Sequence, residues 1–160
     1  MPKALIPGTY DPVTLGHLDV IERATRIFSS VVVAVAESQK KGPGTLFSID
    51  ERVSFIKDAV ALLPNVEVKP FNTLLVNFAE EMGVDTIVKG LRVVTDFEWE
   101  FQQASINYQL NPELETLFIM SNPRFMYLSS SMVKEIASMG GDISDWVTPM
   151  VQRELIKRYK

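Results

Sequence analysis

The stretch KALIPGTYDPVTLGH, residues 3–17, joins a short apolar run to the start of a segment with helical spacing. The run KALIP, residues 3–7, is typical of a buried strand, and the segment 15–28 has the pattern of an amphipathic helix. The apolar positions that give this helix one buried face are Leu18, Ile21, Ala24 and Phe28. Residues 7–17, at the junction of strand and helix, hold two glycines, two prolines, two threonines and the only histidine of the chain, His17. We therefore expect a strand, a shaped loop and a helix in succession.

The same alternation continues to the end of the chain. Further strands are expected at 30–36, 66–71, 85–90 and 115–120. Further helices are expected at 48–63, 73–82, 96–110 and 130–138, with a last one starting at Thr148 and Pro149. Ser48 and Glu51 form the sequence of a capping box at the start of the second helix. This order predicts an α/β fold: a Rossmann-like, doubly wound, five-stranded parallel sheet with helices on both faces and a C-terminal helix.

Composition narrows the class of protein. The 160 residues are expected to form a single domain, 1–160, because that length suits one core. A net charge of -4 offers no broad basic surface, so nucleic acid is not an expected partner. The longest aliphatic run, VVVAVA at 31–36, is far too short for a bilayer, and the first residues lack the apolar core of a secretory signal. From the missing signal and span we expect a cytoplasmic protein without membrane association. The lack of cysteine excludes thiol catalysis and leaves the redox compartment open.

Three loops fall where a doubly wound sheet binds ligands, at the carboxyl ends of its strands. In the first, Gly8 allows backbone amides to approach an anion, and Thr14 is placed to cap the helix that carries His17. Its glycine spacing matches neither the dinucleotide fingerprint nor a P-loop. A phosphate-binding loop is one interpretation, and a proline-rich turn with a surface histidine is the other.

The second and third loops favour the phosphate-binding interpretation. KGLRVVTDFEWE, residues 89–100, places Lys89 and Arg92 beside a glycine after the fourth strand. NPRFMYLSSSMVKE, residues 122–135, opens a helix with three serines, which also suit ordinary helix capping. SQKKGPGT, residues 38–45, has the composition of a flexible flap that carries two lysines.

These motifs carry a resemblance to a known family. PGTYDPVTLGH looks like the T-x-G-H variant of the nucleotidylyltransferase signature, and with KGLR and LSSSMVKE at these distances the chain resembles the bacterial phosphopantetheine adenylyltransferases over its whole length. The resemblance implies transfer of the adenylyl group of ATP to 4'-phosphopantetheine, giving dephospho-coenzyme A and pyrophosphate with Mg2+. The substrate phosphate would attack the α-phosphorus directly, without a covalent intermediate.

The resemblance also implies roles for individual residues. The catalytic set is His17, Thr9, Lys41 and Arg92, and the substrate-binding set is Thr9, Lys41, Leu75 and Lys89. The ATP-binding set is Thr9, Tyr10, His17, Gly90, Leu91, Arg92, Glu100, Phe125, Met126, Tyr127, Leu128, Ser129, Ser130 and Ser131. The flap lysine of the family falls on Lys41, with Lys40 as the alternative, and no residue is assigned as a metal ligand, since ATP oxygens and water suit Mg2+.

Two positions depart from the family pattern, and two other functions stay open. The family usually has arginine where Lys89 stands and phenylalanine where Tyr10 stands. The nearer alternative is an adenylyltransferase acting on nicotinamide mononucleotide, although those enzymes typically carry S-S-T-x-x-R in place of SSSMVK. The farther alternative is a silent adenine-nucleotide sensor, which would not need groups aimed at a transition state. The resemblance further implies a homohexamer and feedback inhibition by coenzyme A.

Overall fold

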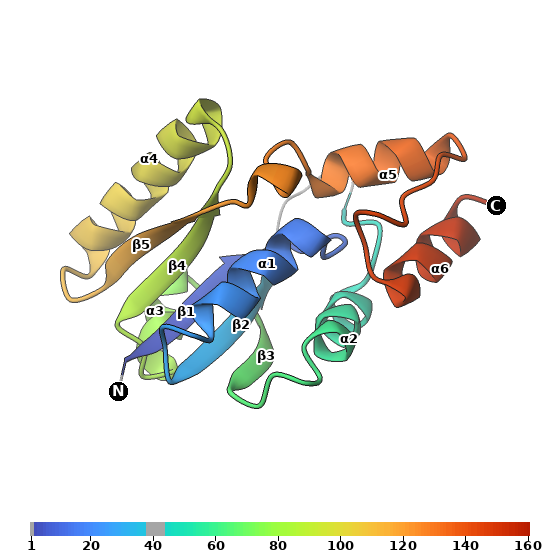
Figure 1. Ribbon diagram of the computed structural model, residues 1–160. Coiled ribbons are helices and arrows are strands. Elements are labelled where there is room, and N and C mark those ends of the chain that lie inside the picture. Colours follow the sequence, from blue (N-terminus) through green and yellow to red (C-terminus); the bar gives the residue numbers. More distant parts are fainter. Residues whose placement is uncertain (1, 38–43) are drawn as a thin grey trace.

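The computed structural model describes residues 2–37 and 44–160. The expected flap at 38–45, with Lys40 and Lys41, lies mostly outside these described residues. The elements along the chain are β1 (Lys3–Gly8), α1 (Leu15–Ala24), β2 (Ser30–Ala36), α2 (Ile49–Ala59), β3 (Val66–Phe71), α3 (Leu75–Glu81), β4 (Thr86–Leu91), α4 (Val94–Leu110), β5 (Glu115–Met120), the 3-10 helix η1 (Pro123–Phe125), α5 (Ser130–Ser138) and α6 (Pro149–Arg158). Figure 1 shows their arrangement around one twisted sheet.

All five strands run parallel, in the order β3-β2-β1-β4-β5. The expected doubly wound fold is therefore confirmed. The strand order reverses between β1 and β4, and the pairing there is short: it covers Ala4 with Thr86 and Leu5 with Ile87. By contrast, β1 pairs with β2 along its whole length. Because β1 and β4 stop pairing before their carboxyl ends, a crevice opens between those ends, where such sheets bind ligands.

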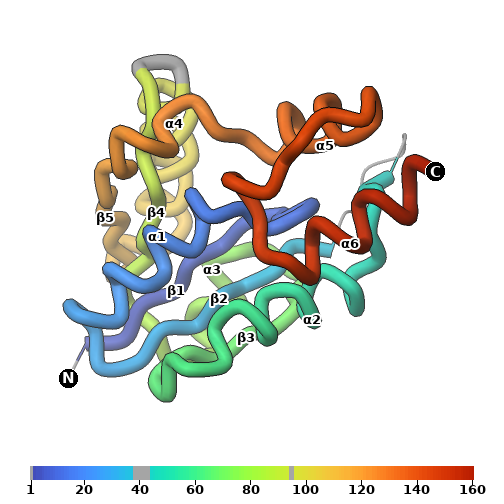
Figure 2. Tube along the Cα trace, turned by 45° about the vertical axis from the view of Figure 1, so that its right-hand side comes forward, coloured from blue at the N-terminus to red at the C-terminus, as the bar shows by residue number. Residues whose placement is uncertain are grey.

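Helices cover both faces of the sheet. On one face α1, α2, α5 and α6 pack over a core that includes Ile21, Phe55, Val133 and Leu155. On the other face α3 packs over a smaller core that contains Leu5, Phe78 and Ile87, and α4 contacts α3, β4 and β5. Helices α5 and α6 contact one another, and the tube in Figure 2, turned from the first view, shows both on the side of the molecule away from β5. No helix among the described residues has the length and apolar character needed to cross a membrane.

The expected strands are confirmed, and the strands at 30–36, 66–71 and 115–120 have the expected bounds. Several helix ends were wrong. The first two helices end at Ala24 and Ala59, earlier than the sequence pattern suggested, because tighter bonds such as Ile27 N to Ala24 O and Leu63 N to Val60 O replace the helical ladder. Apolar residues beyond those ends still point into the core, so the periodicity continues where the helix does not. The capping box of Ser48 and Glu51 is confirmed.

Candidate active site

A cavity of about 420 Å³ lies in the crevice between the carboxyl ends of β1 and β4. Its lining comes from four places that are far apart in the sequence: the end of β1 with the loop into α1, the end of β4 with the start of α4, the segment around η1, and α1 itself. The lining residues are Ile6, Pro7, Gly8, Thr9, Tyr10, Thr14, Gly16, His17, Val20, Lys89, Gly90, Arg92, Asp96, Glu100, Ser121, Phe125 and Leu128. The three loops that the sequence analysis singled out thus meet at one space.

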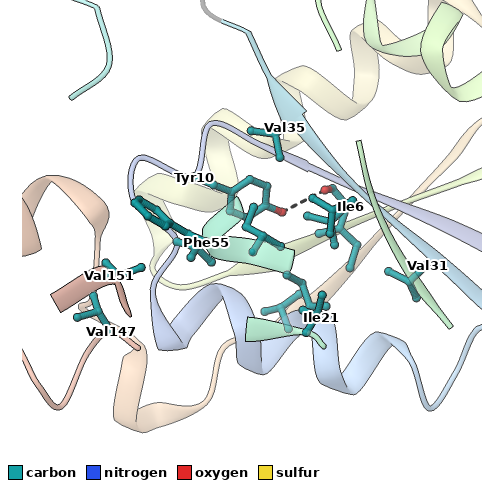
Figure 3. Close-up of a cluster of buried hydrophobic side chains, with 14 of the residues drawn as sticks. Ile6, Tyr10, Ile21, Val31, Val35, Phe55, Val147 and Val151 are labelled. Carbon is teal, nitrogen blue, oxygen red and sulfur yellow. Dashed lines mark hydrogen bonds between the residues drawn. The ribbon is translucent and has the colours of Figure 1, made fainter. Parts of the chain in front are cut away.

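The loop after β1 is held in an unusual backbone shape. Tyr10 has a φ of 52°, which is rare for a residue with a side chain. Its side chain turns back into the core, where the hydroxyl donates to the Ile6 carbonyl at 3.1 Å, as the dashed line in Figure 3 shows. Gly8 makes room for this turn, because a Cβ at that position would stand 2.9 Å from the Tyr10 ring. Burial raises the pKa of Tyr10 well above its usual value, so the hydroxyl stays protonated and able to donate.

His17 occupies the third position of α1, where its ring completes a capping box. The Thr14 backbone N–H donates to Nδ1 of His17 at 2.9 Å, and Thr14 Oγ1 accepts from the His17 N–H at 3.4 Å. Because Nδ1 accepts, the neutral ring carries its proton on Nε2. Burial, with a smaller contribution from the Arg92 charge, lowers the pKa of His17 from 6.5 to about 4. Before substrate binds, the ring is therefore a neutral donor whose orientation is fixed by the hydrogen bond at Nδ1.

The two cations of the cavity are each paired with a carboxylate of α4. Lys89 Nζ lies 2.8 Å from Glu100 Oε2, and Arg92 Nε donates to Asp96 Oδ2 at 2.7 Å. Arg92 also donates through Nη1 to the Leu128 carbonyl, which ties β4 to the segment before α5. With His17 neutral, the described lining carries two positive and two negative groups. The charges of these four groups cancel, so a polyphosphate would need additional positive charge to be neutralised here.

Asp11 anchors the whole loop from behind the cavity. Its buried carboxylate accepts the Leu46 and Phe47 backbone N–H groups at 2.9 and 3.0 Å, and it forms an ion pair with Lys134 Nζ at 2.9 Å. Ser130 Oγ donates to the Pro12 carbonyl at 2.7 Å. The loop is thereby fixed both to the segment that enters α2 and to α5.

Comparison with known proteins assigns the chain to a family. Residues 5–136 match the cytidylyltransferase-like family. The chain is 47% identical over 160 residues to the phosphopantetheine adenylyltransferase of Caldanaerobacter subterraneus subsp. tengcongensis, with 100% of this chain and 99% of that protein covered. The chain belongs to the phosphopantetheine adenylyltransferase family. It is accordingly an enzyme of the nucleotidyltransferase class, and the resemblance read from its motifs is confirmed.

Solved structures share the fold of this adenylyltransferase family member. A protein of Vibrio parahaemolyticus assigned as a nicotinate-nucleotide adenylyltransferase superimposes with a TM-score of 0.68 at 23% identity, covering 98% of this chain and 93% of that one. A bifunctional NMN adenylyltransferase/ADP ribose pyrophosphatase of Francisella tularensis gives a TM-score of 0.68 at 14% identity, covering 98% of this chain and 49% of that one. At these identities the likeness shows the fold alone.

The structure brings most of the residues expected from the adenylyltransferase motifs into the cavity, but not all. The expected residues in the lining are Thr9, Tyr10, His17, Lys89, Gly90, Arg92, Glu100, Phe125 and Leu128. Leu75 lies apart, at the start of α3, packed against the core of the other face. Ser129 caps α5 by accepting the Met132 N–H at 3.1 Å, and Ser130 is engaged with the first loop. Leu91, Met126, Tyr127 and Ser131 are not among the lining residues, and Lys41 lies outside the described residues.

Four residues with structural roles around the site of this adenylyltransferase were not anticipated. Asp11 and Lys134 form the anchor described above, Asp96 holds Arg92, and Arg52 of α2 donates to the Thr9 carbonyl. In the sequence, Asp96 is one of several carboxylates near a helix start, where the helix dipole alone accounts for them. A different contact of the site, the capping box of Thr14 and His17, could have been found from the sequence. The two residues have the spacing of such a box, with histidine in the place of glutamate.

Proposed function

We propose that the chain transfers the adenylyl group of ATP to 4'-phosphopantetheine, forming dephospho-coenzyme A and pyrophosphate in coenzyme A biosynthesis. The observation that carries this proposal is that the neutral His17 ring and the cations Lys89 and Arg92 line one and the same cavity. The 47% identity to a named phosphopantetheine adenylyltransferase supports the choice of acceptor.

The proposed mechanism is direct in-line attack by the substrate phosphate on the α-phosphorus. An ionised phosphate is already a nucleophile, so the site needs no strong base, and a histidine with a lowered pKa that is tied down at Nδ1 is poorly suited to that role. Its Nε2–H is suited to donating to an α-phosphate oxygen, where charge builds up in the transition state. Arg92 and Lys89 would hold phosphate oxygens, with Thr9 at the end of β1 beside them. Catalysis then consists of positioning and charge stabilisation.

The residues fit a Mg2+ ion that arrives on the triphosphate. No cluster of three or more His, Asp or Glu side chains suited to a metal is found among the described residues, and the cavity carboxylates Asp96 and Glu100 are already paired with cations. Arg92 and Lys89 would hold such an ion indirectly, through the phosphates that they bind. When bound, the ion would neutralise charge on the phosphate oxygens and supply the positive charge that the lining lacks.

The first experiment is pyrophosphate release from ATP and Mg2+ with 4'-phosphopantetheine, run in parallel with nicotinamide mononucleotide. We expect pyrophosphate release with 4'-phosphopantetheine and none with nicotinamide mononucleotide. Release only with the mononucleotide would move the chain to the alternative acceptor. ATP binding without turnover of either acceptor would point to a nucleotide sensor.

The role of His17 is tested by His17→Ala. If the ring stabilises the transition state, kcat should fall by about 10²–10³-fold, the usual loss for one such donor, with a much smaller change in ATP affinity. Asn77→Ala, on the exposed part of α3, is the control and should keep wild-type kcat. Equal losses of kcat and ATP affinity would reduce His17 to a binding residue.

We also propose that the chain works in the cytoplasm as a homohexamer and responds to coenzyme A. Helix α4 supports assembly, because none of its side chains that the structure describes is buried, and Trp99 and Phe101 are 61% and 56% exposed. Coenzyme A shares the pantetheine arm of the substrate, so it is expected to compete for the same cavity. Inhibition that is overcome by excess 4'-phosphopantetheine would support this.

A further inference from the structure

Arg52 is a buried cation that lies behind the active site and takes no part in the chemistry proposed above. It belongs to the first turns of α2, and only 2% of its surface is exposed. A guanidinium is buried this deeply only where acceptors surround it. The partners of Arg52 therefore indicate its role.

Arg52 holds three backbone carbonyls from three separate segments of the chain. Its Nη1 donates to the Thr9 carbonyl at 2.7 Å and to the Ala36 carbonyl at 2.9 Å, and its Nε donates to the Phe47 carbonyl at 3.2 Å. Ala36 is the last residue of β2, Thr9 follows β1, and Phe47 immediately precedes the cap of α2. One planar side chain thus sets the relative positions of two strand ends and a helix entry.

The bond to Thr9 fixes the direction of a peptide that borders the cavity. A trans peptide points its C=O and the following N–H to opposite sides. Because Arg52 holds the Thr9 carbonyl from the side of α2, the Tyr10 N–H is turned the other way, and Thr9 and Tyr10 both line the cavity. Among the described residues no acceptor is found for the Tyr10 N–H. Such an amide is a donor available to a phosphate oxygen.

Other contacts make this arrangement rigid. Tyr10 has the left-handed backbone noted above, which persists only where its surroundings enforce it. Its ring packs edge to face on His17, with centroids 4.9 Å apart. A shift of the Thr9 peptide would therefore move Tyr10, and with it the packing of the His17 ring.

We infer that Arg52 is a positioning residue for adenylyl transfer: by holding the Thr9, Ala36 and Phe47 carbonyls, it aims the Tyr10 N–H at the phosphate site and keeps His17 in register. The inference rests on the proposed function for its kinetic test only. Arg52 touches no substrate, and its effect reaches the reaction through the backbone of the first loop.

The test compares Arg52→Lys with wild type. Lysine keeps the positive charge near Asp11 but lacks the fork that reaches three carbonyls. We expect kcat to fall by about 10²-fold, as for a misplaced transition-state donor, with ATP affinity by calorimetry changed by less than about 3-fold. Leu114→Ala is the matched control: Leu114 is buried just before β5, at the opposite edge of the sheet, so it should lower the melting temperature without lowering kcat of the folded enzyme.

A second readout needs no turnover. His17 is the only histidine, so its ring gives a single assignable NMR signal. We expect this signal to shift in Arg52→Lys and to stay at its wild-type position in Leu114→Ala. A wild-type signal together with wild-type kcat in Arg52→Lys would overturn the inference, and so would a kcat loss matched by the control at equal thermal destabilisation. If wild type fails to use 4'-phosphopantetheine, the proposed function fails, and the NMR signal alone decides about Arg52.

Discussion

The anchor of the first loop gives a sharp stability prediction, the substitution Asp11→Asn. Asp11 is 5% exposed, and its two oxygens accept the Leu46 and Phe47 N–H groups and the Lys134 ammonium. Asparagine has nearly the same shape but only one side-chain acceptor. The new NH2 group must therefore face either the Phe47 N–H or the Leu46 N–H together with the Lys134 ammonium, and none of these accepts a hydrogen bond.

The size of the effect follows from these contacts. A buried N–H left without an acceptor costs about 1–3 kcal/mol. The lost ion pair adds about 1 kcal/mol, a discounted value because the Lys134 side chain is 27% exposed and can be rehydrated. The sum is about 2–4 kcal/mol, which for a chain of this size lowers the melting temperature by about 5–15 °C.

Thermal unfolding at pH 7, followed by calorimetry and circular dichroism, measures the shift. Asp58→Asn, an exposed carboxylate of α2, is the control and should stay within about 0.5 kcal/mol of wild type. Lys134→Met and the double variant complete a cycle in which we expect a coupling free energy of about 1 kcal/mol. A melting temperature of Asp11→Asn within about 2 °C of wild type would refute the reasoning, since it would mean that the buried amides are satisfied without this carboxylate.

Three further predictions concern the cavity and the α4 surface. Because burial lowers the pKa of His17 to about 4 in the folded chain, the unfolded chain takes up a proton first on acidification, so the free energy of unfolding should fall as pH drops from 6.5 toward 4; NMR titration of the ring should give a midpoint well below 6.5, and a midpoint at the ordinary value would contradict the burial. Lys89→Arg restores a bidentate group and should lower the KM for 4'-phosphopantetheine by about 5-fold, whereas an unchanged KM would place that phosphate elsewhere. Trp99→Glu should convert an assembly seen by analytical ultracentrifugation into smaller species, and no change would exclude this part of α4 from the interface.

The residue pattern was most informative where interactions between residues close together in the sequence are enough to determine the local structure. The run at 30–36 is almost continuously apolar because β2 is buried between two strands and two layers of helices, and such strands leave an unambiguous pattern. The cap at Ser48 was equally legible, since donor and acceptor lie three residues apart. Helix ends were less legible, because Phe28 stays buried beyond the end of α1.

The candidate site likewise has one part that the sequence revealed and another that only the tertiary structure revealed. Its motifs are continuous stretches, so the loop after β1, His17 and the cations at the end of β4 were visible in the sequence, and with them the family. The carbonyls that Arg52 holds lie 5, 16 and 43 residues away from it, and Asp11 meets Lys134 across 123 residues. In the sequence these side chains are ordinary charged residues of helices and loops. Folding gives them their roles, because burial forces each charge to find partners wherever the chain passes, and that depends on how strands and helices far apart in the sequence are packed together.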